Sequence, residues 1–208
     1  MTDEPKTPVN SAPGDQDPAQ GPGTSLRADA ARNVAQIRAA AIAAFRGRGL
    51  GTPLEEIAAA AGVSKATVYN RFGGRAGLID AVIGKLVAAE MHAVMDKAQR
   101  AADPWEAIAA FVTGRRDLQY REPAFTDALL MTYPESEQLA AIATAAIEAT
   151  TSLVQQGQDA GVIRQDFTVQ DLYYADVANG LALRTLPKPA RRDYDRRTRF
   201  FLDSLRPR

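Results

Sequence analysis

The chain has 208 residues, of which 46% are hydrophobic, and its 25 basic side chains balance 25 acidic ones. This length allows one sizeable core, or a small head and a larger body. Cysteine is absent and His92 is the only histidine, which excludes disulfides and the usual zinc ligand sets. Because the sequence has no apolar run that could span a bilayer and no basic, apolar leader, we expect a cytoplasmic protein without a membrane partner.

Charge is distributed unevenly along the chain. Residues 1–25 are acidic, rich in Pro, Gly, Asp, Gln and Ser, and almost devoid of apolar side chains, so we predict a disordered tail. Residues 27–75 carry eight basic and three acidic side chains, whereas residues 76–190 carry nine basic and fifteen acidic ones. Since nonspecific DNA affinity depends on local phosphate neutralisation, a basic head on an acidic body fits DNA binding by one end.

Two predicted helices follow the tail. Apolar residues recur at helical spacing over residues 28–46, which predicts the first helix. Thr52, Pro53 and Glu55 suit the N-cap, N1 and N3 positions of the second helix. Gly62 is suited to the turn that ends this helix, because glycine tolerates a positive φ there.

A third short helix completes the predicted head. Ser64 is placed to cap it, and Val68 and Phe72 lie four residues apart on its inner side. The other side is polar and holds Lys65, Ala66, Thr67, Asn70 and Arg71. Two short helices joined by a tight turn, the second with a polar outer face, indicate a helix-turn-helix and make DNA the first partner to consider. The same spacing also suits an ordinary helical hairpin with a solvated face.

These segments resemble a known family. AGVSKATVYNRFGGRAGLI is similar to the signature of the tetracycline-repressor (TetR) family of bacterial transcription regulators, and RNVAQIRAAAIAAFRGRGLGT is similar to the first helix of the same domain. The match covers about residues 32–83, and AGVIRQDFTVQDL at 160–172 is a weaker similarity. Two departures are Gly73-Gly74, which we expect to loosen the turn into the next helix, and Arg75, where the family commonly has lysine.

The resemblance implies that the head binds an operator in double-stranded DNA. Tyr69 and Arg75 are expected to bind phosphate, Thr52 to do so at a helix N-terminus, and Arg32 to contact phosphate or the minor groove. The residues expected to contact the base edges are Lys65, Thr67, Asn70 and Arg71. The complete predicted DNA-binding set is Arg32, Thr52, Ser64, Lys65, Ala66, Thr67, Tyr69, Asn70, Arg71 and Arg75.

The remainder of the chain predicts further helices and no strand. Their expected extents are 75–101, 103–121, a short helix from 123, 134–161, 168–186 and 191–205. We therefore predict an all-α fold of about nine helices. A three-helix helix-turn-helix head should occupy residues 26–75, and a helical effector-binding and dimerisation body should occupy residues 76–208.

The resemblance also implies a homodimer formed through the last two helices. Small side chains on the penultimate helix would permit a close helix–helix approach; they are Ala175, Ala178, Gly180 and Ala182. Such a dimer would place two recognition helices in successive major grooves, about 34–36 Å apart, on a palindromic operator. The alternative is that the penultimate helix packs only inside the monomer.

The body is expected to hold a cavity for a small-molecule effector. Methionine and aromatic side chains suit an adaptable apolar cavity, although they also serve as plain core. The candidates are Met91, Met95, Trp105, Phe111, Tyr120, Phe125, Met131, Tyr133 and Tyr173. A ligand that favours one body conformation would swing the helix at 75–101 and move the heads out of register with the grooves. We therefore predict a ligand-responsive repressor, with activation as an alternative.

Signals for catalysis are weak. The chain has neither G-x-S-x-G nor a phosphate-binding glycine loop, and Glu90-Met91-His92 lacks the spacing of a di-iron motif. We therefore predict no catalytic residue, no metal and no cofactor. The competing hypothesis is a helical small-molecule-binding or interaction protein whose head does not bind DNA.

Overall fold

The structure, a computed structural model, describes residues 22–130 and 136–207, and the side chains of residues 29–130 and 136–207. Every regular element in these ranges is helical, which confirms the all-α prediction. The elements are α1 (Pro22–Arg48), α2 (Leu54–Ala60), α3 (Lys65–Phe72), α4 (Arg75–Ile83), the π-helical turn η1 (Gly84–Ala88), α5 (Ala89–Gln99), α6 (Pro104–Arg121), α7 (Pro123–Leu130), α8 (Glu137–Asp159), α9 (Val169–Thr185) and α10 (Arg191–Leu205).

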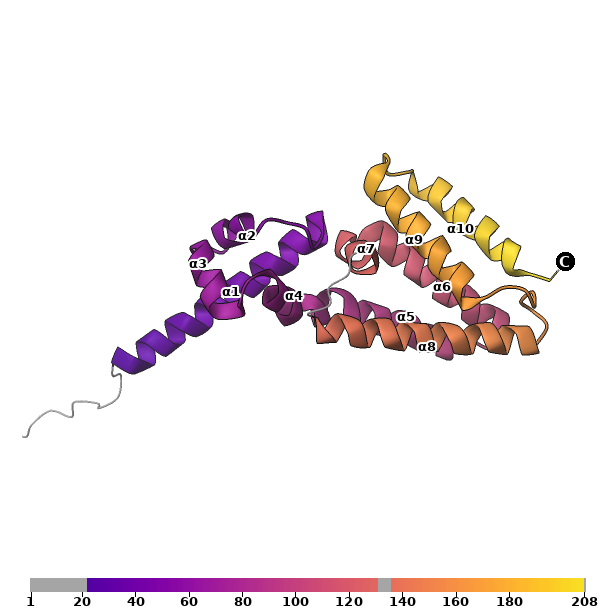
Figure 1. Ribbon diagram of the computed structural model, residues 1–208, viewed down its shortest axis with the longest axis horizontal. Helices are drawn as coiled ribbons and strands as arrows, with labels where there is room; N and C mark the ends of the chain where they lie inside the picture. Colours follow the sequence, from indigo (N-terminus) through magenta and orange to yellow (C-terminus); the bar gives the residue numbers. More distant parts are fainter. Residues whose placement is uncertain (1–21, 131–135, 208) are drawn as a thin grey trace, which may run out of the picture.

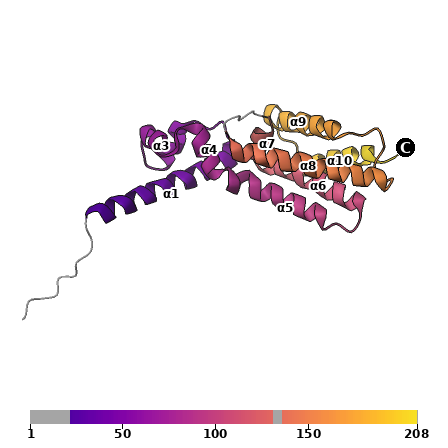
Figure 2. The same ribbon diagram turned by 60° about the horizontal axis from the view of Figure 1, so that its bottom comes forward.

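The molecule is elongated, with a small helical head at one end and a helical body at the other (Figure 1). In the head, α2 and α3 lie beside α1, and α4 leads into the body. In the body, α5, α6 and α8 run side by side (Figure 2), while α9 and α10 lie together along one edge in the view of Figure 1. The short helix α7 lies between the two parts, because it packs against α1 as well as against α6 and α9.

The head is held together by a small apolar core. Ile37 and Phe45 of α1, Ile57 of α2 and Val68 of α3 are all fully buried in it, as their helical spacing predicts. α1 starts at Pro22, earlier than predicted, so residues 22–25 are helical and not part of a disordered tail. Proline fits a first helical turn because its missing amide would be unpaired there. The rest of the predicted tail, residues 1–21, lies outside the described residues.

Side-chain caps mark the starts of α3, α6, α8 and α9 among the described helices. Asp103 caps α6 by accepting a hydrogen bond from the Glu106 amide at 2.8 Å, as predicted. Thr168 and Asp171 form the predicted capping box of α9. The predicted start of α8 at residue 134 lies outside the described residues; the described helix begins at Glu137, where Ser136 accepts from the Leu139 amide at 3.2 Å.

The helix predicted over residues 75–101 is continuous but not uniformly α-helical. It consists of α4, the turn η1 and α5, so the described residues contain nine helices when these three are counted together. Within η1, Leu86 and Val87 are both buried. Such π-helical turns insert into α-helices and are frequent at functional sites. Here the turn lies where the helix enters the body.

Candidate nucleic-acid interface and ligand cavity

The helix-turn-helix geometry is present in the head. Gly62 has a φ of 67° and joins α2 to α3 in a tight turn. Ser64 caps α3, because its Oγ accepts a hydrogen bond from the Thr67 amide at 3.1 Å. Val68 is fully buried and fixes the inner side of α3 against the head core. These contacts leave the opposite side of α3 free of packing.

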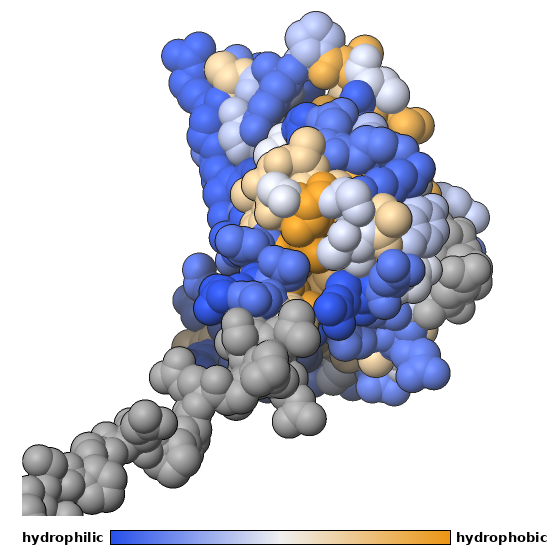
Figure 3. Space-filling view, turned by 90° about the vertical axis from the view of Figure 1, so that its left-hand side faces the viewer, coloured by the Kyte–Doolittle hydropathy of each residue, from blue (hydrophilic) through white to orange (hydrophobic). Residues whose placement is uncertain are grey.

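The outer side of α3 is polar and accessible. Thr67 is half-buried there, and Tyr69 has half of its surface exposed. The other exposed residues of this face are Ser64, Lys65, Ala66, Asn70 and Arg71. Figure 3 looks at the molecule from the head end, where hydrophilic residues predominate and apolar residues form small areas near the centre and at the upper right. Such a surface suits a polar, charged partner better than an apolar one.

Lys65 is held in place by two neighbours. Its ammonium forms an ion pair with Glu55 of α2, and it lies 5.8 Å from the centroid of the Tyr69 ring. The hydrogen bond from Lys65 is the main reason why the pKa of Glu55 is lowered, and the same bond raises the pKa of Lys65. The positive charge of α3 is therefore partly neutralised by a carboxylate on the same face.

The Gly73-Gly74 pair forms a defined turn between α3 and α4. Gly73 has φ 70°, and its amide donates to the Tyr69 carbonyl at 2.8 Å. Gly74 has φ 102°, and a Cβ there would lie 2.9 Å from Cε1 of Tyr69. Only glycine adopts both backbone conformations without strain, and the second also leaves room for the tyrosine ring.

Three predicted DNA contacts have other partners in the structure. Thr52 is buried and is not the N-cap of α2, a position that Pro53 takes; its hydroxyl donates to the Gly49 carbonyl at 2.8 Å. With 4% of its surface exposed, Thr52 is too buried for its side chain to reach phosphate. Arg75 is half-buried and donates from Nη1 to the Leu50 carbonyl at 2.7 Å. Arg32 is exposed on α1 and pairs with Asp29.

A mostly apolar cavity of about 270 Å³ lies in the body. Its walls come from α8, from α7, from the start of α9, from α6 and from the region where η1 meets α5. Met91, Phe125 and Tyr173, three of the predicted pocket residues, line it. Ile147 and Tyr173 are both about half exposed, so the cavity opens between α8 and α9.

Other predicted pocket residues lie elsewhere. Met95 and Phe111 line a separate hollow near the turn between α5 and α6. Trp105 stacks with Arg206, whose guanidinium carbon lies 3.8 Å from the centroid of the Trp105 ring. Met131 and Tyr133 lie outside the described residues. Helical spacing predicted the inward direction of these side chains but not which space each one faces, because two hollows lie along the same helices.

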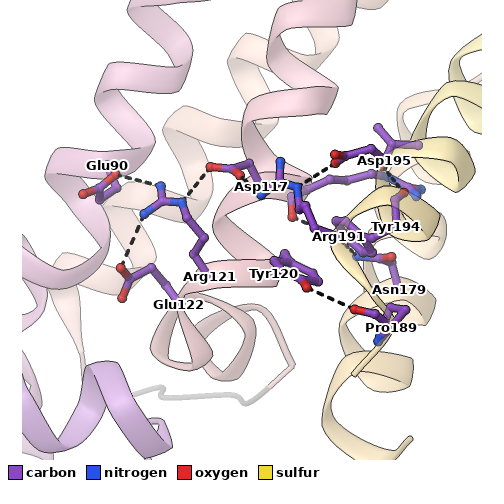
Figure 4. A network of polar contacts seen from close by, with 12 residues as sticks. Glu90, Asp117, Tyr120, Arg121, Glu122, Asn179, Pro189, Arg191, Tyr194 and Asp195 are labelled. Atoms are coloured by element: carbon purple, nitrogen blue, oxygen red, sulfur yellow. Dashed lines mark hydrogen bonds and ion pairs between the residues drawn. The ribbon is translucent and has the colours of Figure 1, made fainter. Parts of the chain in front are cut away.

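Tyr120 is absent from the cavity because it belongs to a polar network between α6, α9 and α10 (Figure 4). Its hydroxyl donates to the Pro189 carbonyl at 3.0 Å, and its ring lies 4.8 Å from that of Tyr194. Tyr194 in turn donates to the Arg116 carbonyl at 2.8 Å and accepts from Asn179 at 2.8 Å. This network fixes the outer helices to α6.

Sequence reasoning missed a buried charge cluster beside the cavity. Arg115 lines the cavity, and its Nη2 lies 3.0 Å from Oδ2 of Asp176 on α9. Arg116, the next residue, is also buried. A signal was available: Arg115 follows Phe111 and Val112 on the apolar stripe of α6, a position where a charged side chain is rare unless it is paired.

A helix-turn-helix head with a free polar helix, joined to a helical body with an apolar cavity, defines a DNA-binding regulator with a ligand domain. The chain belongs to the TetR family of bacterial regulatory proteins: residues 37–82 match the model of that family. Residues 103–207 match the model of the SbtR-like transcriptional regulator C-terminal domain. No curated protein sequence matches the chain.

Several solved structures share the fold. The ketosteroid transcriptional regulator KstR2 of Mycobacterium tuberculosis is 17% identical with a TM-score of 0.61, over 84% of this chain and 95% of that one. The TetR-family regulator PfmR from Thermus thermophilus is 21% identical with a TM-score of 0.59, over 81% and 96%. AibR in complex with isovaleryl coenzyme A and operator DNA is 19% identical with a TM-score of 0.64, over 85% and 98%.

TetR-family members bind operator DNA and small-molecule ligands, act as dimers and are not enzymes. The chain is accordingly a ligand-responsive DNA-binding regulator. No helix among the described residues is long and apolar enough to cross a membrane. The described side chains also contain no cluster of three or more His, Asp or Glu residues that could hold a metal ion.

Proposed function

We propose that this protein is a cytoplasmic repressor that binds a palindromic operator as a homodimer and leaves it when a small molecule enters the body. The observation that carries the DNA-binding part is the outer face of α3. Its side chains are exposed, while Val68 and the Ser64 cap hold the helix from the other side. This combination of a fixed helix and an unpacked polar face is what major-groove readout requires.

The proposed contacts divide by position. Lys65, Thr67, Asn70 and Arg71 are the base-reading candidates, with Ser64 and Ala66 at the helix start close to the DNA. Tyr69 and Arg32 are the phosphate candidates. Arg75 is a further phosphate candidate, through the guanidinium nitrogens that do not donate to the Leu50 carbonyl. Thr52 is left out because its side chain is buried.

Apolar exposure supports dimerisation through α9 and α10. Tyr174, Leu181, Leu186 and Phe200 each expose more than half of their surface on these two helices and the segment between them. Isolated exposed apolar residues are ordinary, but a group on one edge of the body marks an interaction surface. Gly180, in contrast to our expectation, faces the monomer interior, where a Cβ would lie 3.2 Å from Gln119.

The route from cavity to head runs through α7. Phe125, Ala128 and Leu129 of this helix line the cavity, and Asp127 of the same helix binds the turn between α1 and α2. A ligand that shifts α7 or the neighbouring η1 turn changes the position of the head relative to the body. Because two heads must fit two grooves at once, a small change in their spacing lowers operator affinity.

The test is DNA binding by the full-length dimer, measured by fluorescence anisotropy on DNA upstream of its own gene at several salt concentrations. We expect a salt-sensitive, sequence-selective complex, and Arg32→Ala, at a proposed phosphate contact, should lower the slope of log K against log salt by about one. Arg100→Ala is the matched control, because Arg100 is an exposed arginine at the far end of α5. A folded dimer that shows no selective complex would favour the alternative, a ligand-binding protein with an inactive head.

A further inference from the structure

The cavity selects for a ligand that is mostly hydrocarbon. Of the described residues that line it, only Arg115, Thr150 and Tyr173 carry polar side chains, and none is acidic. Thr150 uses its hydroxyl to donate to the Ala146 carbonyl of its own helix at 2.7 Å. The volume of about 270 Å³ lies just below the usual range for ligand pockets, roughly 300–1,000 Å³. A small apolar molecule therefore fits, and Arg115 supplies the only charge in the described wall.

Arg115 has hydrogen-bonding capacity to spare. Its side chain is only 10% exposed, and its Nε has no hydrogen-bond partner. The contact of its Nη2 with Asp176 is an ion pair at 3.0 Å, yet neither carboxylate oxygen of Asp176 has the geometry of a hydrogen bond. A buried guanidinium normally has its donors satisfied, so an acceptor on the cavity side of Arg115 would complete the site.

The charge of the cluster is also unbalanced. Arg115, Arg116 and Asp176 are each more than nine-tenths buried, which leaves two cations with one anion. Arg116 also has an unpartnered Nε, and its guanidinium lies 4.4 Å from the centroid of the Phe201 ring. Burial raises the pKa of Asp176 although both arginines oppose this, and burial lowers the pKa of Arg116. An excess buried positive charge is unfavourable unless an anion compensates it.

We propose that the effector is a small apolar monocarboxylate, whose carboxylate binds Arg115 and whose hydrocarbon part lies against α7 and α8. This assignment rests on the proposed function, of which it specifies the ligand. A carboxylate matches the planar donor set of a guanidinium and brings the one negative charge that the cluster lacks. Apolar wall residues such as Phe125, Leu139 and Ile142 accommodate the chain.

Isothermal titration calorimetry on the full-length protein tests the proposal with octanoate and with octanamide, which has the same chain but no charge. We expect octanoate to bind once per chain and at least tenfold more tightly than octanamide. Arg115→Gln alone leaves the Asp176 carboxylate without its ion pair, so the R115Q/D176N double variant is also measured. Both variants should bind the two probes equally. Arg121→Gln, an exposed position on the same helix, should keep the wild-type preference.

Three results would overturn the assignment: equal binding of the two probes to the wild type, an octanoate preference retained in R115Q/D176N, or no binding of either probe. The salt-dependent anisotropy measurement on the same preparation separates the two proposals. If operator binding is intact while octanoate does not bind, the ligand class is wrong and the DNA-binding function stands. If octanoate binds while no selective DNA complex forms, the DNA-binding proposal fails and the ligand class stands.

Discussion

Asp127 of α7 accepts a hydrogen bond from the backbone amide of Leu50, in the turn between α1 and α2, at 2.8 Å. Its other carboxylate oxygen lies 3.0 Å from Nε of Arg184 on α9. Gly49 makes this approach possible, since a Cβ at that position would lie 2.0 Å from Asp127 Oδ2. The Leu50 carbonyl is bound in turn by Arg75 of α4. One turn of the head is therefore held by both the body and the next helix.

Replacing Asp127 with alanine should loosen the head. The Leu50 amide would lose its only acceptor in a buried position, which costs about 1–3 kcal/mol of stability. Urea unfolding should record that loss, and amide hydrogen exchange should show faster exchange at Leu50. Arg184→Ala is the control, because it removes the ion pair and leaves the bond to Leu50. If both variants protect the Leu50 amide as well as the wild type does, the bond does not restrain the turn.

A glycine-to-alanine change should have opposite effects on stability at Gly74, in the turn before α4, and at Gly47, in α1. Gly74→Ala forces an alanine into φ 102° and against the Tyr69 ring, so we expect a loss of at least about 1 kcal/mol and weaker DNA binding. Gly47→Ala meets nothing within 4 Å and lies in α1, so it should stabilise by about 0.5–1 kcal/mol. Urea unfolding of both variants provides the comparison. Similar changes in the two would mean that the turn tolerates a side chain.

Features encoded by a few neighbouring residues were predictable from the sequence. The caps at Asp103 and Thr168 and the apolar stripe around Val68 depend on spacings of three or four residues, and the structure has them as expected. The prediction that Thr52 is the N-cap of the second helix was wrong. Its cap pattern was sound locally, but α2 begins one residue later than predicted, with Pro53 at the N-cap, and the Thr52 hydroxyl donates to the Gly49 carbonyl.

Features that depend on distant segments were not predictable. Asp127 and Leu50 are 77 residues apart, and no pattern along the chain links them. Periodicity likewise places Tyr120 and Met95 on inner helix faces without saying which hollow or network they meet. Arg115 and Asp176 were visible as charges within apolar stretches, yet only their 3.0 Å separation makes them a cluster beside the cavity.

The ion pair between Glu55 and Lys65 predicts a variant with stronger DNA binding. Glu55 is an exposed carboxylate on the face that would meet phosphate, and it partly neutralises Lys65. Glu55→Gln should therefore raise operator affinity several-fold at low salt and steepen the salt dependence. Glu148→Gln, on the exposed face of α8, makes the same change in net charge away from the head. Equal gains from the two substitutions would indicate a general charge effect with no local role for Glu55.

The ion pairs of Asp117 should make the stability of the contact between α6 and α10 depend on pH. The carboxylate accepts hydrogen bonds from Arg121 at 2.7 Å and from Arg191 of α10 at 2.6 Å (Figure 4). Burial by itself would raise the pKa of Asp117, but the two guanidinium groups outweigh it and hold this pKa below the ordinary value. Because the native pKa is lower than the unfolded one, the charge stabilises the native state fully above the unfolded pKa, near 3.9.

This stabilisation should disappear as the pH falls through the lowered native pKa of Asp117. Urea unfolding at pH steps from about 6 to 2 should show the wild type losing more stability on acidification than Asp117→Asn. The gap between the two proteins should be largest at neutral pH and close at the acid end. Asp159→Asn is the control, since that exposed carboxylate is bound only by the neutral side chain of Gln155. A gap that stays constant over the whole range would mean that the Asp117 charge does not stabilise the contact between α6 and α10.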